Sequence, residues 1–523
     1  MRNNHLDGAL CEIDRTSTQD VRELCRVFWV GGASSTFRLL FPTRQMATMN
    51  SLLALTNTTR VLDDIRAIHV FGNMRPSLST ADMAARRWLV TRMEAAGLEG
   101  VQLDGLGTVY GSAGVDNVPA LLLGAHTDTP PQPHSWLDSS LGIAYALEAA
   151  RVLQQGGAAD WTAWSVIDWQ DAGSRFGTLT ASSAFVSSAT HALRRTPALR
   201  SAQREAKVPW VPVMHASGRH GGWLGYLEAH TERVAASSTR RLAASNASLG
   251  IVGAIVGVRR FRVACSGVTS HTSSVTMMER RDATLEAMRL AVAADDGLRA
   301  LCAAWEDGGC DARWTIDELG GFVAPSTVAG AANVSLEVRA VDNSLLGSMA
   351  RLVTSIVDQS AQSATARGAP VCAVHSDDIV AATPMDKGMV ECVTRAAAET
   401  VGEHRAVAVP SMSLHDASPL STVMPAALLL LPNTPEDAGW EARVTDGARA
   451  YVRAALMLAM GQCESAGGPT CIVGDVRRNQ RLNDEGWAEA LDYGNADEEE
   501  AAPAAEGAAS NIDSDALEDF PDL

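Results

Sequence analysis

The chain has 523 residues, of which 46% are hydrophobic and 20% charged, and its formal net charge is −18 at pH 7. This length supports two or three domains, each large enough to bury a core. The apolar runs fall short of the about 18 residues that a membrane span needs. The basic residues form no cluster dense enough to indicate nucleic-acid binding. We therefore expect a cytoplasmic protein that uses neither a membrane nor a nucleic acid as a partner.

The two ends of the chain differ in composition from its middle. Between Asp484 and Leu523 there are 14 acidic residues and no Lys or Arg, which leaves a net charge of −4 for the rest of the chain. Such a segment favours disorder, and we expect residues 466–523 to form an acidic, solubilising tail. Residues 1–57 are expected to be an N-terminal extension. Their composition is consistent with an organelle-targeting segment and equally with an upstream extension ahead of an internal start.

The cysteines are scattered. There are nine of them, an odd number, and none forms a C-x-x-C pair. This usage is typical of a reducing compartment, and it argues against a disulfide framework or a zinc ribbon.

The middle of the chain alternates between helix and strand patterns. Residues 59–97 are predicted to be largely helical, and short strands are expected near 100–111, 119–125 and 163–169. A long Ala/Leu-rich helix lies between the last two of these strands. This order predicts an α/β domain with buried strands.

A different order follows in residues 250–365. A strand at 255–265 and a helix at 282–304 precede strands near 320–324 and 331–340 and a helix at 343–365. This β-α-β-β-α order predicts a separate α+β domain inserted into the first. The expected division is 58–249 and 369–465 for the two parts of the main domain and 250–368 for the insertion.

A predicted buried strand, residues 121–125, ends in polar residues. His126 and Asp128 follow it, and alternation places these two side chains on one side of the strand. A neutral imidazole can bind a divalent metal, and a nearby carboxylate can orient its ring. Asp138 follows at the start of the Ala/Leu-rich helix. It is either an N-cap of that helix or a further metal ligand, and its position leaves both open.

Five further clusters carry groups with possible chemistry, and each by itself is more often structural than functional. They are Val166–Phe176, Tyr226–Glu232, Gly253–Asp282, Pro325–Arg339 and Pro410–Ala417. Their joint order carries more information than any one of them.

In that order the chain resembles the dinuclear zinc amidohydrolases that include allantoate amidohydrolase, N-carbamoyl-L-amino-acid hydrolase and β-ureidopropionase. These are relatives of the carboxypeptidase-like and aminoacylase-like metallohydrolases. The resemblance covers residues 58–462 and is strongest in GYLEAHTER, against the family's aYLElHIEQG, and in LGIVGAIVGVRRFRVACSGVTSHTSSVTMMERRDA. It implies an aminopeptidase-like zinc-hydrolase domain with an inserted ferredoxin-like lid and dimerisation domain, and hence a homodimer.

The resemblance implies one metal site that is complete and another that is not. His126, Asp138 and His230 match one set of family ligands, although the turn that carries Asp138 is one residue longer than usual. The second site should add the second acid of an "EEgsRF" motif and a late histidine. Here Ala172 and Asn433 stand at those positions. We therefore expect one tight divalent ion, zinc or manganese, rather than two.

The family's general base is the first acid of the same motif. Asp171 stands there, a carboxylate that is one methylene shorter than the family's glutamate. A gapped alignment would place Gln170 there instead, and an amide cannot accept a proton at neutral pH.

The residues that hold the oxyanion and the substrate carboxylate in the family match His271, Ser326 and Arg339 here, which makes His271 a candidate catalytic residue as well, with Ser326 replacing an asparagine. An arginine fork suits a carboxylate, although Arg339 could equally form an ordinary salt bridge. Asp282, in the same region, is expected to cap a helix.

Two functional hypotheses follow from these matches. The chain could be a metal-dependent hydrolase of a non-peptide C–N bond in a ureido or carbamoyl acid, such as allantoate or an N-carbamoyl amino acid. It could instead be a catalytically degraded homologue that binds a small acid or a partner.

Overall fold

The computed structural model describes residues 48–130, 137–187, 196–209, 211–218, 221–232, 247–305, 310–321, 324–432 and 439–463. Most of the expected N-terminal extension, the acidic tail and Asn433 lie outside these described residues. Of the helices within the described ranges, none is both long enough and apolar enough to cross a membrane.

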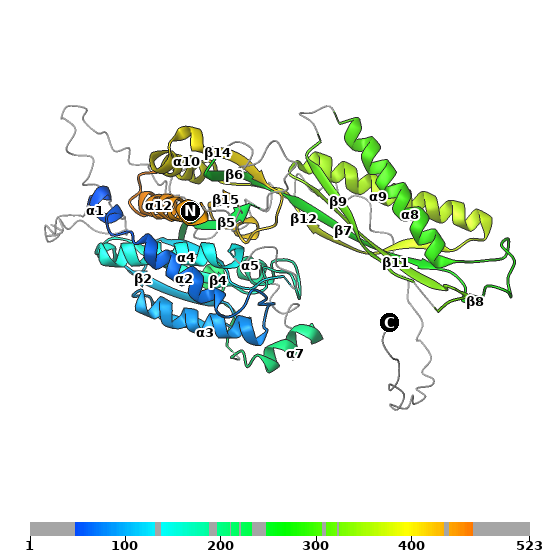
Figure 1. Cartoon of the computed structure of the whole chain (residues 1–523), viewed down its shortest axis with the longest axis horizontal. Coiled ribbons are helices and arrows are strands. Elements are labelled where there is room, and N and C mark those ends of the chain that lie inside the picture. Colours follow the sequence, from blue (N-terminus) through cyan, green and yellow to red (C-terminus); the bar gives the residue numbers. More distant parts are fainter. Residues whose placement is uncertain are drawn as a thin grey trace, which may run out of the picture. The chain divides into compact units, whose positions relative to one another are not determined.

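Nine strands form a mixed sheet, the large sheet, in the order β1-β2-β4-β3-β5-β15-β6-β13, with β14 paired to β6 (Figure 1). Strands β4, β3, β5 and β15 are parallel neighbours. The carboxyl ends of parallel strands meet at one edge, which is where ligands bind in open α/β sheets. The strands are β1 (Glu99–Leu103), β2 (Val109–Gly114), β3 (Ala120–His126), β4 (Ala163–Trp169), β5 (Trp223–Glu232), β6 (Leu249–Ile255), β13 (Thr383–Pro384), β14 (Ala406–Ser411) and β15 (Ala426–Pro432).

Helices cover both faces of the large sheet. Leu121 and Leu123 of β3 pack into a core with α2, α4, α10 and α12, whereas Leu122 packs into a second core with α5, α7 and α11. This explains why β3 is an uninterrupted apolar run, because both of its faces are buried. The helices are α1 (Met49–Leu53), α2 (Thr58–His69), α3 (Thr80–Ala95), α4 (Asp138–Gln155), α5 (Thr180–Val186), α7 (Pro197–Glu205), α10 (Lys387–Val401), α11 (Ala417–Leu420) and α12 (Trp440–Ala459), with short 3-10 turns at Ala158–Asp160, Ala216–Gly218 and Glu403–Arg405.

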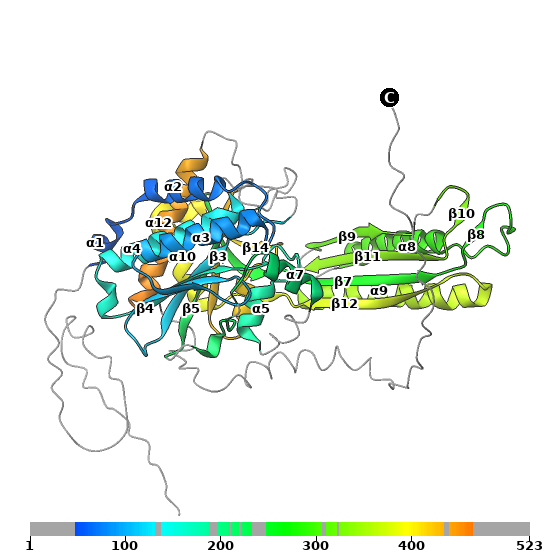
Figure 2. The same ribbon diagram turned by 90° about the horizontal axis from the view of Figure 1, so that it is seen from below.

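Four antiparallel strands form the small sheet, in the order β12-β7-β11-β9. Phe261 and Val263 of β7 pack in a core against α8 and α9, and α9 runs along the strands (Figure 2). A short ribbon of β8 and β10 adjoins this unit in the sequence. The elements are β7 (Gly257–Ser266), β8 (Ser270–His271), α8 (Ala283–Ala303), β9 (Ala312–Leu319), β10 (Thr327–Val328), β11 (Ala331–Ala340), α9 (Asn343–Arg367) and β12 (Val371–Val380).

The main elements confirm the predicted fold class, an α/β unit with an α+β unit whose β-α-β-β-α-β order is ferredoxin-like. Asp282 caps α8, as expected, by accepting from the Leu285 amide at 3.3 Å. Strand β9 ends at Leu319, so the described residues 320, 321 and 324 of the strand expected near 320–324 are not in a strand, and residues 322–323 lie outside the described residues. The chain passes from the large sheet to the small sheet after Ile255, where β6 ends, and returns after Val380, where β12 ends. Both positions are later than the expected boundaries at 249 and 368.

The expectation that the chain has no disulfide framework is contradicted for the described part of the chain. Disulfides join Cys265 to Cys372, Cys302 to Cys310 and Cys392 to Cys463. The sequence spacing gave no sign of the first pair, because its members are opposed on β7 and β12, more than 100 residues apart. Distant cysteines meet through strand register, which C-x-x-C counting does not reveal.

Gly142 allows α4 to pack closely against the large sheet. A Cβ atom at this position would overlap the carbonyl oxygen of Ala229 and the Cβ of Ala125. These two neighbours immediately precede His230 and His126, so the glycine fixes how closely α4 approaches the strand ends that carry both histidines.

We predict that Gly142→Ala lowers the free energy of unfolding by about 1–3 kcal/mol, because an added methyl group overpacks this contact. Urea denaturation measures the change. Gly218→Ala is the matched control, since a Cβ there meets nothing within 4 Å. Equal stability of the two variants would contradict the close approach.

Candidate functional site

His126 is the last residue of β3, and its side chain is 14% exposed. Its Nδ1 lies 2.9 Å from the carbonyl oxygen of Asp128. A carbonyl oxygen can only accept, so Nδ1 carries the proton and Nε2 keeps its lone pair. Burial and the neighbouring His230 lower the pKa of His126, which favours this neutral form. The expected carboxylate partner is secondary, because Asp128 Oδ1 lies 3.8 Å away.

His230 lies near the end of β5 and is buried between two carboxylates. Its Nδ1 is 3.4 Å from Asp138 Oδ1, and its Nε2 is 2.8 Å from Glu228 Oε1. Its ring centroid lies 4.9 Å from that of His126. Burial lowers the pKa of His230, but the hydrogen bonds to the two carboxylates outweigh it and raise the pKa to about 10.

Asp138 opens α4, but it does not cap it. The N-cap position is Leu137, which provides no side-chain cap. The Asp138 carboxylate instead accepts from the amide and the hydroxyl of Thr231, at 3.1 and 2.7 Å. Burial raises the pKa of Asp138, but the hydrogen bond and charge of His230 hold it well below its usual range. The structure therefore brings together His126, Asp138 and His230, as the sequence predicted, and directs Asp138 away from the capping role.

In the described part of the chain, the group of possible metal ligands whose donor atoms lie close together is on the Glu228 side of His230 and does not include His126 or Asp138. Glu228, His230 and His415 offer ligand atoms within 4.8 Å of one another, and all three are buried. Glu228 uses its second oxygen to accept from the Ala417 amide at 2.8 Å, and His415 Nε2 lies 2.8 Å from Ser411 Oγ. These hydrogen bonds fit Glu228 as the carboxylate that orients the His230 ring, an arrangement common behind metal-binding histidines.

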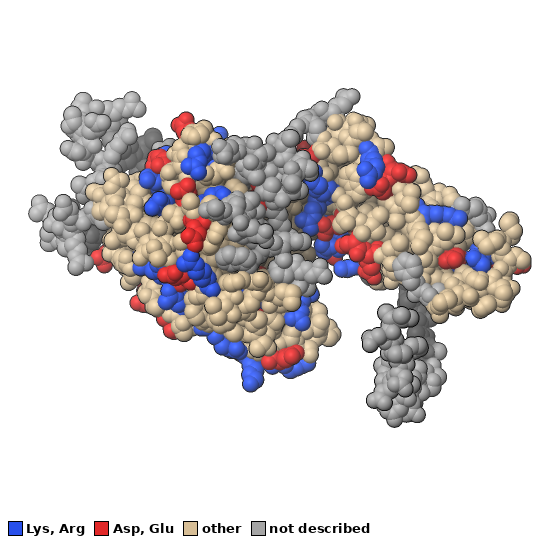
Figure 3. Space-filling view, viewed as in Figure 1, with Lys and Arg blue, Asp and Glu red and all other residues tan. Residues whose placement is uncertain are grey.

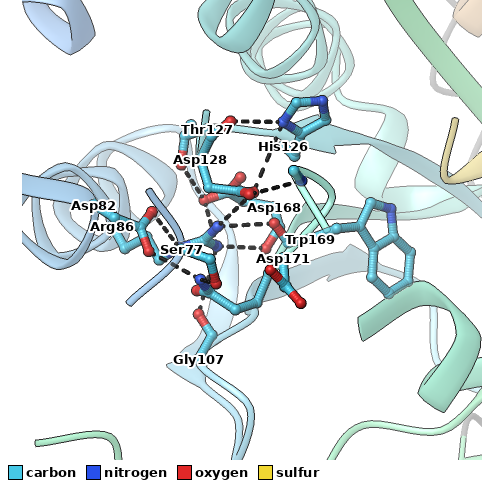
Figure 4. Close-up of polar contacts among 12 residues, drawn as sticks. Ser77, Asp82, Arg86, Gly107, His126, Thr127, Asp128, Asp168, Trp169 and Asp171 are labelled. Carbon is cyan, nitrogen blue, oxygen red and sulfur yellow. Dashed lines mark hydrogen bonds and ion pairs between the residues drawn. The ribbon is translucent and has the colours of Figure 1, made fainter. Parts of the chain in front are cut away.

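Behind the strand ends lies a buried ionic network that the sequence reading missed (Figure 4). Arg86 is fully buried and contacts Asp82 at 2.9 Å, Asp168 at 2.9 Å and Asp128 at 3.5 Å. It also donates to the carbonyl oxygens of Asp168 and Trp169. Arg86 belonged to an apparently ordinary amphipathic helix, and no local pattern distinguishes a buried arginine there. Burial, despite the charge of Arg86, raises the pKa of Asp168 to about 7.

Arg75 is a second fully buried arginine, and it touches the segments on either side of the site. Its Nε donates to the Thr127 carbonyl oxygen at 3.1 Å, and its Nη2 donates to Ser139 Oγ at 2.7 Å. Thr127 follows His126, and Ser139 follows Asp138. The sequence reading did not single out Arg75 either.

Asp171, the expected general base, has its carboxylate engaged by its own loop. It accepts from the amides of Arg175 and Phe176, at 2.8 and 3.0 Å, and from the Thr180 hydroxyl. Burial raises the pKa of Asp171 to about 6 against these hydrogen bonds. Gln170 points into the buried network, where it donates to Asp82 at 2.9 Å, which favours the ungapped alignment.

The three expected substrate residues do not lie together within one chain. His271 and Thr327 are register partners in the β8–β10 ribbon, and Ser326 adjoins it with a left-handed φ of 61°. Arg339 lies near the opposite end of β11, where its Nε pairs with Glu337 and its Nη1 donates to the Met412 carbonyl oxygen at 3.2 Å. From Ala331 to Arg339 an extended strand spans about 27 Å at roughly 3.4 Å per residue.

Glu337 also pairs with Arg260 on β7, so this end of the small sheet places one carboxylate between two arginines. Acidic and basic side chains are similarly intermixed over the surface in Figure 3. The salt-bridge alternative for Arg339 is therefore present in the structure, and its substrate role stays a proposal.

Comparisons with known proteins agree with the motif resemblance. The chain is 29% identical over 247 residues to an N-carbamoyl-L-amino-acid amidohydrolase of Paenarthrobacter aurescens, a match that covers 44% of this chain and 57% of that protein. It is 26% identical over 367 residues to a probable allantoate deiminase of Oryza sativa, covering 62% and 69%. The chain thus spans about half the length of the first curated relatives that it matches. No family model matches.

Among solved structures, an amidase of the hydantoinase/carbamoylase family from Burkholderia phymatum is 29% identical, with a TM-score of 0.61 over 77% of this chain and 98% of that chain. The fold and the motifs therefore agree: the chain is similar in sequence to an N-carbamoyl-L-amino-acid amidohydrolase and a probable allantoate deiminase, and in fold to amidases of the hydantoinase/carbamoylase family.

Proposed function

We propose that this chain hydrolyses a non-peptide C–N bond in a small ureido or carbamoyl acid, with one divalent ion held by His126, Asp138 and His230. The observation that carries the proposal is that the rings of His126 and His230 lie side by side, with their centroids 4.9 Å apart. Each histidine has one nitrogen occupied by a fixed acceptor, and His230 presents its other nitrogen to Asp138. The names of the homologues support the substrate class.

The donor set fits zinc or manganese. Two imidazoles and a carboxylate are ligands that a catalytic zinc uses in proteins, and histidine and carboxylate also suit manganese. Asp138 and Glu228 hold a proton on His230 at neutral pH, and a cation beside Asp138 would replace that proton. A bound ion of this kind supplies Lewis acidity to a carbonyl group and to a water molecule.

Asp171 is the residue of this chain that we assign to proton transfer. A general base works best when its pKa lies near the working pH, and burial brings Asp171 closer to that range. Its three hydrogen bonds hold the carboxylate in one orientation, which fixes its position but also limits its reach.

Two copies of the chain would complete the substrate site. If His271 and Arg339 act on one substrate, their positions at opposite ends of the small sheet require the ribbon of a second chain. We therefore propose a homodimer, as the resemblance implies.

A specific observation supports the alternative, a catalytically degraded homologue. Ala172 cannot ligate a metal, and Asp171 is shorter than the family base and is engaged by its own loop. Such a protein would bind a ureido acid without efficient turnover.

The function is tested by ammonia and amine release from a panel of N-carbamoyl amino acids and allantoate at fixed zinc or manganese. We expect slow hydrolysis of at least one acid, abolished by Asp171→Asn. A variant combining Asp171→Glu, Ala172→Glu and Asn433→His should gain at least ~10-fold, because it restores the family base and the second ligand pair. Binding of the acid with no turnover in any variant would favour the degraded homologue.

Metal content provides an independent prediction. After gentle purification, elemental analysis should give close to one tight divalent ion per chain. His126→Ala should remove that ion, whereas His415→Ala, on the other side of His230, should retain it. Loss of the ion in His415→Ala with retention in His126→Ala would move the site to the Glu228 side.

The loop role of Asp171 predicts a loss of stability. Asp171→Ala leaves the part-buried amides of Arg175 and Phe176 and the buried hydroxyl of Thr180 without their acceptor, and we expect it to lower the free energy of unfolding by about 1–3 kcal/mol. The matched control is the exposed Asp116→Ala, which should stay within about 0.5 kcal/mol of the natural protein. Chemical denaturation measures both, and an unchanged Asp171→Ala would contradict the hydrogen bonds described.

Assembly is tested by subunit mixing. His230→Ala and His271→Ala damage opposite halves of a shared site, so a mixed dimer retains one intact site. Random pairing should restore about a quarter of the natural activity, while each variant alone stays inactive. If the two variants carry different affinity tags and purified mixed dimers recover no activity, a shared site is contradicted. A monomer mass by light scattering would contradict the dimer.

A further inference from the structure

Arg75 forms a bridge between two segments of the chain. Its side-chain donors reach three carbonyl oxygens and one hydroxyl, those of Thr127, Gly72 and Ser139. The Arg75 amide donates to the Thr129 hydroxyl at 2.8 Å, and the Arg75 carbonyl oxygen accepts from the Thr129 amide at 2.9 Å. The backbone of Arg75 is therefore held against the segment that follows β3, and its side chain extends from there to the start of α4.

The two bridged segments carry the proposed ligands. Thr127 is the neighbour of His126, and Ser139 is the neighbour of Asp138. The first turn of α4 has no side-chain cap, and Ser139 departs from helical geometry with φ −84° and ψ 17°. Local helix geometry alone therefore does not set the direction of Asp138, and the contact with Arg75 supplies a constraint at the adjacent residue.

The chemistry of the bridge requires an arginine. A guanidinium presents several donors in a rigid plane, so one side chain can bind Thr127 and Ser139 at the same time. A lysine ammonium is a point charge on a flexible stem and cannot hold both segments in the same fixed geometry. Arg75 is also completely buried, so water does not compete for these acceptors.

We propose that Arg75 is a positioning residue that sets the separation of His126 and Asp138 by tying Thr127 to Ser139, and thereby sets the affinity of the site for a divalent ion. The inference rests on the proposed metal role of His126, Asp138 and His230.

The test measures zinc and manganese affinity of the full chain by competition with a chromophoric chelator. Ser139→Ala removes one hydroxyl from the bridge, and Arg75→Lys keeps the charge but loses the fork. Each should weaken binding about 10–100-fold, the usual effect of removing a group that orients a ligand. Ser165→Ala is the matched control, since it removes a buried hydroxyl that pairs with Ser112 at 2.8 Å, away from the site. It should change affinity less than about twofold.

A double variant separates positioning from general stability. If the residues act through one bridge, Arg75→Lys combined with Ser139→Ala should bind no more than about twofold more weakly than Arg75→Lys alone. If the double variant loses metal affinity by the product of the two single-variant losses, the bridge is contradicted. It is also contradicted if Ser139→Ala binds the metal as tightly as the natural protein. The melting temperature of the metal-free Ser139→Ala protein should stay near that of Ser165→Ala, and a much larger fall would assign Ser139 to stability instead.

The proposed function can fail separately. If Ser139→Ala binds the metal as tightly as the natural protein while His126→Ala abolishes binding, only the role of Arg75 is overturned. A natural chain that binds neither zinc nor manganese overturns the proposed metal site and this inference with it.

Discussion

The His230 ring lies between Asp138 and Glu228, and the rest of the site depends on this buried contact. A buried imidazole with a carboxylate at each nitrogen has little rotational freedom. Its position is set by β5, whose parallel neighbour β3 brings His126 to the same edge of the sheet. The close packing of α4 against these strands then brings Asp138 to Thr231. The site is thus a product of sheet register and one helix approach rather than of a flexible loop.

Buried charges support these strand ends. Arg86 faces three aspartates without access to water, and such groups are tolerated only when they are paired and hydrogen-bonded. The network links α3 to the ends of β3 and β4, directly behind the residues that face the site. Its cost in desolvation is consistent with a role in fixing geometry, since an apolar core would cover the same strands without orienting Asp128.

The sequence predicted the parts of the site that follow from strand patterns. The apolar run before His126 predicted β3. His230 was identified from its motif, whereas the strand that carries it, β5, was not among the expected strands. The roles of Arg75 and Arg86 could not be predicted, because a buried arginine has the same local signature as an exposed one. The disulfides and the partners of Asp171 depend on register and loop conformation, which residue spacing does not encode. The homodimer, in contrast, was expected from the resemblance, and the distance along β11 adds a structural reason for it.

Two of the departures from the pattern of the similar amidohydrolases lie in one loop. The His126, Asp138 and His230 set is complete, whereas Ala172 and the short Asp171 occupy the loop after β4. This contrast supports our proposal that the chain holds a single divalent ion between its two histidines and not on the Glu228 side.

Anomalous diffraction at the zinc absorption edge, from crystals grown with zinc, tests this claim most directly. The account predicts one strong peak per chain, within bonding distance of His126, Asp138 and His230. A peak beside Glu228 and His415, or two peaks of equal strength, would contradict it.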